Sequence, residues 1–149
     1  MAVSGSGLFV PTFKNALGAS QLALDLDADT HKVALFTNSV TPNYDTDTAY
    51  AAAPYNANEV TGTGYTSGGA TLTTATLTSA SGVLKFDGDD VSWTTSTITG
   101  ARCALIYANA LAGKNAILLV DFGADYSTSS GTLSVVWNAA GIATIDLVP

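Results

Sequence analysis

The stretch AILLVDF, residues 116–122, is the part of the sequence that determines the predicted fold. Successive side chains of an extended strand point to opposite faces, so this run is apolar on both faces. A strand of that kind belongs in the interior of a sheet, where both faces are covered. Residues 98–107 form a second, largely apolar run. We predict that the two runs are central strands of a β-sheet.

Two hairpins are predicted on either side of these central strands. Residues 83–86 and 91–95 are apolar runs separated by an Asp-Gly turn, which is a strong hairpin signal. Residues 131–137 and 142–147 flank a short turn and predict a closing hairpin at the C-terminal end. Both pairs are therefore expected to be antiparallel neighbours in a sheet.

The N-terminal half contains three further predicted strands. Leucines alternate with small or acidic residues over residues 22–26, as in a strand with one wet face. After a polar turn, residues 31–37 are predicted to form the returning strand. Residues 70–78 are predicted as a strand with a bulge or with burial on both faces, because Leu72 and Leu77 have opposite parity.

Two segments are predicted to lie outside the strands. Residues 11–17 begin with a proline and are followed by Gly18, which predicts a helix of about two turns. Residues 41–69 have no periodicity and form a long connection, with one helical turn predicted at residues 48–53. Long irregular connections in compact domains are commonly functional or ordered by a partner.

Together these elements predict an all-β fold of about eight antiparallel strands, arranged as a β-sandwich or a jelly-roll-like barrel. Strands do not alternate with long helices, as a parallel α/β sheet would require. The chain has 149 residues, which is close to the commonest size of one domain. We expect a flexible N-terminal arm at residues 1–10 and a single β-rich domain at residues 11–149.

The composition favours a subunit of an assembly. Hydrophobic residues make up 47% of the chain and charged residues only 11%, so much of the surface is neutral. The net charge is −7, and the five Lys and Arg residues are scattered along the sequence. Binding to nucleic acid or to an anionic membrane requires clustered basic residues, and we expect neither.

Cysteine content and the first residues bear on the compartment. Cys103 is the only cysteine, so no intrachain disulfide can form, and we expect a small buried thiol. The opening residues MAVSGSG lack the basic stretch and apolar core of a secretory signal. No run approaches the roughly 18 apolar residues of a spanning helix. We expect synthesis and folding in a host cytoplasm.

Residues for acid–base catalysis are scarce, since the chain has one His and one Glu. His31 borders a turn and is predicted to be an exposed turn residue, and Glu59 lies in the long connection and is predicted to be a solvated charge. No Gly-x-Ser-x-Gly elbow supports a Ser-His-Asp triad. We predict no catalytic residue and expect that the protein is not an enzyme.

Metal and cofactor sites are not predicted either. Asp25, Asp27 and Asp29 have the spacing of calcium-loop ligands, but the glycine and the distal Glu of an EF-hand are missing. The acidic residues of 87–90 are explained by the geometry of a turn. The glycines of residues 62–69 are followed by neither a Lys-Ser/Thr pair nor a helix start, as a phosphate-binding loop requires.

Four blocks of sequence carry a resemblance to a known group of proteins. They are FKNALG (residues 13–18), LDLDADTHKVALFTNSVTPN (24–43), ANEVTGTGYTSGGATL (57–72) and VVWNAAGIATIDL (135–147). In these blocks the chain resembles small virion structural proteins of tailed bacteriophages, which are described as head-associated or decoration proteins. The resemblance implies a β-rich fold and a place on the phage particle, and it supplies no catalytic residue.

The function expected from this resemblance is that of a capsid decoration, or cement, protein on the outer surface of a phage head. Its expected partners are the major capsid protein and further copies of itself, with a homotrimer as the first expectation because such proteins often follow shell symmetry. Tyrosine offers a large contact area at low entropic cost. The expected contact residues come from the N-terminal segment and the long connection: Leu8, Phe9, Val10, Tyr44, Tyr50, Tyr55 and Tyr65.

Two alternatives stay open at the level of sequence. A phage tail component would have the same Thr- and Gly-rich β-structure. A carbohydrate-binding β-sandwich would use exposed Tyr or Trp side chains. Trp93 and Trp137 are predicted to be core aromatics, and an exposed Trp would favour a sugar site or a subunit interface.

Overall fold

The protein is an antiparallel, sandwich-like all-β structure. A computed structural model describes residues 2–148, with 40% of the residues in strands and 5% in helix. This confirms the predicted fold class, and within the described residues the sheets do not close into a barrel. The single α-helix there, α1 (Val10–Leu17), matches the predicted helix and begins one residue earlier. No helix among residues 2–148 is long and apolar enough to cross a membrane.

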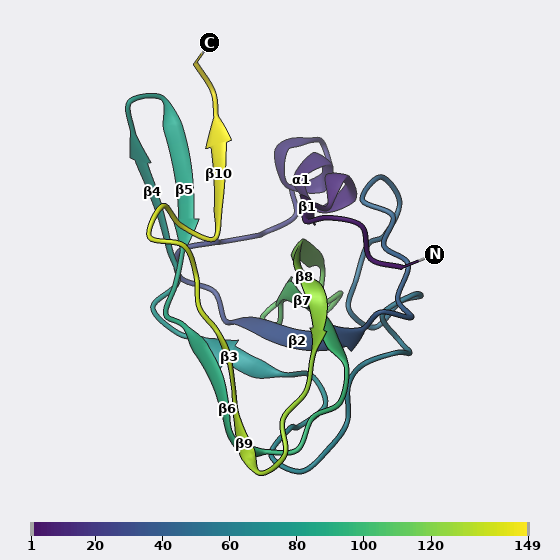
Figure 1. Ribbon diagram of the computed structural model, residues 1–149. Helices are drawn as coiled ribbons and strands as arrows, with labels where there is room; N and C mark the ends of the chain where they lie inside the picture. The colour runs from purple at the N-terminus through teal and green to yellow at the C-terminus, as the bar shows by residue number, and fades with distance from the viewer. Residues whose placement is uncertain (1, 149) are drawn as a thin grey trace.

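The main sheet has five strands and forms the centre of the molecule (Figure 1). All its neighbouring strands are antiparallel, and the two strands predicted to be central do lie side by side in it. In spatial order the strands are β1 (Gly7–Leu8), β8 (Ala116–Tyr126), β7 (Ala101–Ala108), β2 (His31–Thr37) and β3 (Ala70–Leu72).

Two smaller sheets accompany the main sheet. One is a two-stranded ribbon at the lower left of Figure 1, formed by β6 (Val91–Ser96) and β9 (Gly131–Val135). The other has three strands and projects at the upper left, where the chain ends. Its spatial order is β10 (Ala143–Asp146), β5 (Val83–Asp87) and β4 (Thr76–Ala80).

Both predicted hairpins are wrong. β5 and β6 belong to different sheets, and so do β9 and β10. β5 pairs with β4 and β10, whereas β6 pairs with β9. Gly88 does not have the positive φ that a tight Asp-Gly hairpin turn needs, and the chain crosses there from one sheet to the other. The tight turn lies instead between β4 and β5 at Ser81 and Gly82, whose φ angles are 51° and 83°. Two successive positive φ values match the twist of an antiparallel pair.

One face of the main sheet packs against the β6–β9 ribbon. Alternate side chains of β2 and β7, including Val33, Leu35 and Ile106, are fully buried on this face. They form one apolar cluster with Trp93 of β6 and Leu133 of β9. This is the sandwich core, and it follows from the two-residue repeat of the strands.

The opposite face of the main sheet is covered by chain without regular structure. Phe36, Leu105 and Cys103 point to this side and are fully buried. They pack with Phe9 from the N-terminal segment and Tyr55 from the long connection. The connection therefore forms a third layer over the sheet. Burial raises the pKa of the Cys103 thiol to about 12, as expected for a buried thiol.

The N-terminal segment, which was expected to be a flexible arm, lies against the edge of the main sheet. Gly7 and Leu8 pair with β8, and Val3 is only 2% exposed. The Tyr44 hydroxyl donates to the Gly5 carbonyl at 2.6 Å, and an Asp121 carboxylate oxygen accepts from the Gly5 N–H at 2.9 Å. Backbone pairing and these polar contacts hold the segment against the edge of the main sheet.

Three local predictions are wrong because tertiary contacts decide the conformation. Residues 22–26 are not a strand, although Leu24 and Leu26 of this segment pack against the core. Residues 48–53 contain turns in place of the helical turn. The predicted strand at residues 70–78 is divided into β3 and β4, and Thr74 lies at the break with a φ of 53°.

Candidate functional site

The tyrosines of the long connection are bound inside the chain. The hydroxyls of Tyr50 and Tyr65 each donate a hydrogen bond to the Glu59 carboxylate at 2.7 Å. The Tyr55 hydroxyl donates to the Asp47 carboxylate at 3.1 Å. Tyr55 is only 1% exposed. The Tyr50 ring is stacked on the ring of Tyr107 with centroids 4.4 Å apart. These side chains stabilise the connection itself.

Glu59 is the centre of this arrangement, in contrast to the expected solvated loop charge. Besides the two tyrosines, its carboxylate accepts from the Ser67 hydroxyl at 2.8 Å and from the Gly68 N–H at 2.7 Å. Phe36 of β2 forms an isolated β-bridge with Glu59, which places the carboxylate at the edge of the sheet. Carboxylates that accept several hydrogen bonds bind strongly to their donors. The group therefore connects residues far apart along the loop.

The N-terminal residues expected to contact a partner have different environments. Phe9 is fully buried, and Leu8 is partly buried against the core in β1. Val10, at the start of α1, is 50% exposed. Tyr44 is half-buried, and burial raises the pKa of its hydroxyl to about 12. Of the seven expected contact residues, Val10 alone is an exposed apolar side chain.

His31 is buried, and the prediction of an exposed turn residue is wrong. Its ring lies at the start of β2 with no exposed area, 5.9 Å from the ring of Phe86 in an edge-to-face contact. Neither ring nitrogen has a hydrogen-bond partner among the described residues. Burial lowers the pKa of His31. The nearby backbone carbonyl of Asp25 and the carboxylate of Asp29 are the largest opposing influences, and they offset that effect only in part. The imidazole is therefore neutral at pH 7.

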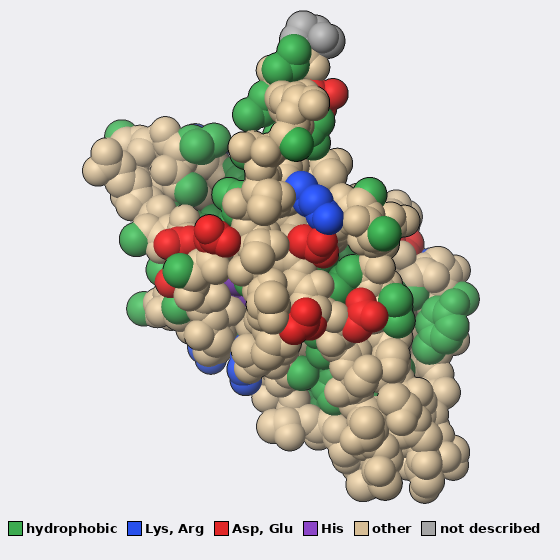
Figure 2. Space-filling view, turned by 90° about the vertical axis from the view of Figure 1, so that its left-hand side faces the viewer, with side chains coloured by type: hydrophobic (Ala, Val, Ile, Leu, Met, Phe, Trp, Pro, Cys, Tyr) green, Lys and Arg blue, Asp and Glu red, His purple; other side chains and the backbone are tan. Residues whose placement is uncertain are grey.

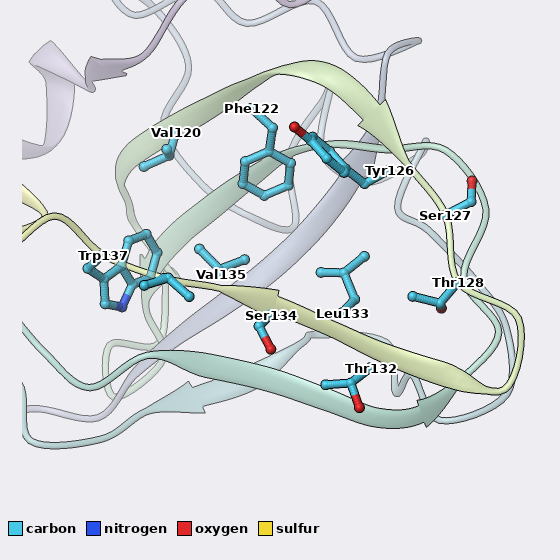
Figure 3. A pocket seen from close by; sticks show the side chains of 11 residues that line it. Val120, Phe122, Tyr126, Ser127, Thr128, Thr132, Leu133, Ser134, Val135 and Trp137 are labelled. Atoms are coloured by element: carbon cyan, nitrogen blue, oxygen red, sulfur yellow. The ribbon is translucent and has the colours of Figure 1, made fainter.

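The strongest candidate for a binding site is a groove between β8 and β9, which was not predicted from the sequence. We call it the β8–β9 groove; its volume is about 460 Å³. Figure 3 shows Phe122 of β8 pointing across it toward Leu133 and Val135 of β9, with Val120 and Tyr126 on either side of Phe122. It is further lined by Ser127, Thr128, Thr132, Ser134, Val136 and Trp137.

A bulge in β8 brings the aromatic side chains into this groove. Cys103 pairs with Asp121 and Ala101 with Tyr126, so residues 122–125 stand opposite Arg102 alone. Such an insertion bends the strand and redirects its side chains. Asp121 holds the bulge, because its carboxylate accepts from the Arg102 Nε and from the Gly123 N–H, each at 2.9 Å. Burial acts to raise the pKa of Asp121, but these hydrogen bonds outweigh it and the pKa is lowered.

The groove is aromatic, partly exposed and uncharged. Tyr126 is 52% exposed and Val136 is 70% exposed. Trp137 is half-buried, and its Nε1 donates to the Asp89 carbonyl at 2.8 Å, which fixes the indole ring at the end of the groove. Trp93 is a core residue, as predicted. Among the described residues that line the groove, none is charged.

Most of the hydroxyl groups at this groove already have partners within the chain. Ser134 is hydrogen-bonded to Ser92 at 2.8 Å, and Thr128 to Ser96 at 2.9 Å. The Ser127 hydroxyl accepts from the Gly100 N–H at 2.9 Å. The groove therefore offers aromatic and aliphatic contact area, with few hydroxyl groups directed at a ligand.

No protein-family model, curated protein or solved structure matches this chain. The surfaces of the molecule itself therefore carry the functional argument.

Two sequence signals could have led to the groove. Val120 and Phe122 have the same parity, which predicts one shared face, but the strand was expected to end at Phe122. Gly123, with a φ of 75°, marks the bulge that allows the strand to continue to Tyr126. A glycine within a strand pattern indicates a bulge, and the apolar residues beyond it belong to the same strand.

Proposed function

We propose that the protein is a non-enzymatic virion structural protein, a decoration protein that binds the outer surface of a phage head. The observation that carries this proposal is the uncharged aromatic groove between β8 and β9. Interface cores are enriched in aromatic residues and depleted in charged ones. The resemblance of the sequence to phage structural proteins supplies the class of partner, which is the major capsid protein.

The groove suits an apolar segment of a capsid subunit. Tyr126 and Val136 expose apolar area, and Phe122 and Trp137 line the groove. The Trp137 ring is held in place by the hydrogen bond of its Nε1. Rigid aromatic side chains bind with little loss of conformational entropy. Acidic side chains are scattered among neutral ones on the face that Figure 2 shows. Because no charged side chain lines the groove itself, binding there is expected to depend weakly on salt.

A carbohydrate ligand is the alternative that the exposed Tyr126 and the half-buried Trp137 favour. Sugar sites combine an aromatic surface with polar groups that recognise the hydroxyls. Here the hydroxyls of Ser127, Thr128 and Ser134 are engaged inside the chain. The chemistry of the lining therefore favours an apolar protein segment over a sugar.

The proposal is tested by binding of the purified protein to empty phage heads that lack it. We expect cosedimentation with the heads in amounts that correspond to many copies per shell, and loss of binding when Tyr126→Ser is combined with Val136→Ser. The matched control is Val10→Ser, since Val10 is 50% exposed but lies on α1, outside the groove. The control variant is expected to bind like the wild type.

Other outcomes decide between the alternatives. Binding of a few copies to tails and none to heads would support the tail component. Retention on a glycan array that is lost in the Tyr126→Ser variant would support the carbohydrate-binding role. If the groove variant still binds heads but Val10→Ser does not, the contact lies in the N-terminal segment and not in the groove. Hydrolysis of an ester, glycan or peptide by the purified protein would overturn the non-enzymatic role.

A further inference from the structure

The three-stranded sheet has an open edge at β10. Among the described residues, β10 pairs with β5 on one side and with no strand on the other. The Leu147 N–H donates to the Gly82 carbonyl at 2.9 Å. The backbone N–H and C=O groups of successive residues in an antiparallel strand point to alternate sides. Like those of Leu147, the backbone groups of Ile145 therefore point toward β5, whereas those of Thr144 and Asp146 point toward the open edge.

One face of this sheet is apolar and incompletely covered. Ile145 and Leu147 of the C-terminal segment lie on it beside Leu84 of β5, and together with Phe13 and Leu17 of α1 they line a groove of about 740 Å³. Leu17 is 87% exposed and Leu147 is 65% exposed. The outer part of the sheet projects from the body of the molecule (Figure 1), whereas the inner end of the β10 edge, at residues 142–144, faces β1 and β8 across a groove of about 250 Å³. Large exposed apolar side chains beside an unpaired strand indicate a contact surface.

We propose that β10 pairs with β10 of a second copy of this chain, antiparallel and about a two-fold axis centred on Ile145. In this register Ile145 stands opposite the partner's Ile145, and Thr144 stands opposite the partner's Asp146. Thr144 and Asp146 then exchange the backbone hydrogen bonds that the open edge leaves unmade. The two three-stranded sheets join into one sheet of six strands. This pairing is independent of the proposed binding of the β8–β9 groove to a capsid.

The second copy is the favoured occupant because this short strand is self-complementary. Asp146 is the only charged residue between residues 142 and 148, and the register sets it opposite a threonine and not opposite another aspartate. Like charges directly opposite one another are destabilising, and a Thr–Asp pair can hydrogen-bond. A two-fold axis perpendicular to the sheet leaves both apolar faces on the same side.

The same register covers the apolar face. Ala143 stands opposite the partner's Leu147, so the exposed leucine of each copy is placed over a small residue of the other. Ala143 and Ile145 line the inner part of the apolar surface, where they meet Phe86 and Leu118. The pairing thus buries exposed leucine side chains and satisfies the unpaired strand edge at one contact.

The first test measures the mass of the protein in solution by light scattering or sedimentation. The wild type is expected at twice the chain mass of 15.1 kDa. Thr144→Pro removes only an outward-pointing N–H and is expected to shift the mass to that of one chain, as is Leu147→Asp. Val136→Asp is the control, because Val136 is 70% exposed but lies on the β8–β9 groove, and this variant is expected to stay dimeric.

The second test determines the register. Ile145→Cys is expected to form a covalent dimer on mild oxidation, because directly opposed residues without mutual hydrogen bonds have Cα atoms about 4.5 Å apart, within disulfide range. Thr144→Cys alone is expected to stay uncrosslinked, and the double variant Thr144→Cys with Asp146→Cys to crosslink. Cys103 is fully buried and does not interfere.

A wild type that is monomeric at high micromolar concentration would overturn the pairing, as would a trimer whose mass is unchanged by Thr144→Pro and Leu147→Asp. Circular dichroism shows whether each variant is folded, and the Ile145→Cys result stands independently if Thr144→Pro does not fold. Head binding by a monomeric Leu147→Asp variant would show that the two contacts are separate. A dimer that fails to bind heads would contradict the capsid proposal alone.

Discussion

The long connection has little regular secondary structure but buries its large side chains, whereas the three-stranded sheet has regular strand pairing but leaves apolar side chains exposed. Residues 41–69 have almost no regular structure, yet Tyr55 is fully buried and Glu59 accepts four hydrogen bonds within the connection. Strands β4, β5 and β10 have regular pairing, yet Leu147 stays 65% exposed beside an open groove. Order in this protein therefore depends on side-chain contacts more than on strand geometry.

The contrast has a physical cause in how each region covers apolar area. The connection places large aromatic rings over one face of the main sheet, and its polar groups are satisfied by a carboxylate. The small sheet turns an apolar face toward α1, but the helix is too short to cover it. The first region is complete within one chain, and the second leaves surface for another molecule.

The largest expected effect is from Phe36→Ala, which removes a fully buried ring beneath the connection. We expect the free energy of unfolding to fall by about 3–5 kcal/mol, measured by urea denaturation. Leu17→Ala is the control in the open groove, and because Leu17 is 87% exposed its effect should stay within about 0.5 kcal/mol. Equal losses in the two variants would remove the contrast between the regions.

The next largest effect is expected from Glu59→Ala. It leaves the hydroxyls of Tyr50 and Tyr65 and the Gly68 N–H without their acceptor, and we expect a loss of about 2–3 kcal/mol. Glu59→Gln keeps one acceptor oxygen and should cost less. Proteolysis within residues 41–69 is a second readout, and it should accelerate more for the Ala variant. An unchanged cleavage rate would show that the connection is ordered without Glu59.

Acid should weaken the protein through His31. Because burial lowers its pKa in the folded state, the unfolded state binds more protons as the pH falls below the ordinary value of 6.5. The contribution of neutral His31 to the free energy of unfolding is therefore fully present above that pH and is lost below it. The total loss is about 1.4 kcal/mol for each unit by which folding lowers the pKa. His31→Phe keeps the ring contact with Phe86 and should remove the pH dependence between pH 7 and pH 5.

The carboxylates act in a separate pH range. The pKa values of Asp25, Asp87 and Asp121 are lowered, so the stability that they contribute is lost only as the pH falls through about 3.8 and below. An equal slope between pH 7 and pH 5 in wild type and His31→Phe would contradict the role assigned to His31.

The smallest expected effect is from Leu147→Ser. Since this leucine is 65% exposed in one chain, the unfolding free energy of the monomer should change by less than about 0.5 kcal/mol. Self-association, measured on the same sample, should weaken strongly. A loss above about 1 kcal/mol in the monomer would mean that Leu147 is already packed within its own chain. The three-stranded sheet would then be covered by its own chain, as the long connection is.

Strand positions were largely predictable because they depend on a local repeat. The bounds of β2 agree with the prediction at both ends, and the central positions of β7 and β8 follow from their apolar runs. The helix α1 was predicted from a proline and a glycine. The burial of Cys103 and Trp93 was expected as well.

The candidate site was less accessible to sequence reasoning. The tyrosines of the connection were expected to bind a partner, but their hydroxyls bind Glu59 and Asp47, which no local pattern indicates. The β8–β9 groove depends on a bulge held by Arg102 and Asp121, residues from two strands. Contacts between distant residues decide both features.

The sequence by itself determined the class of structure and the neutral, weakly charged character of its surface. Alternation of apolar residues and the low content of Lys, Arg, Asp and Glu are properties that each segment carries without its neighbours. The tertiary structure decided which strands pair, that β5 joins β10 and not β6, that His31 is buried, and that one apolar face stays open. Strand pairing and burial depend on which distant segments meet, and many pairings satisfy the same two-residue repeat.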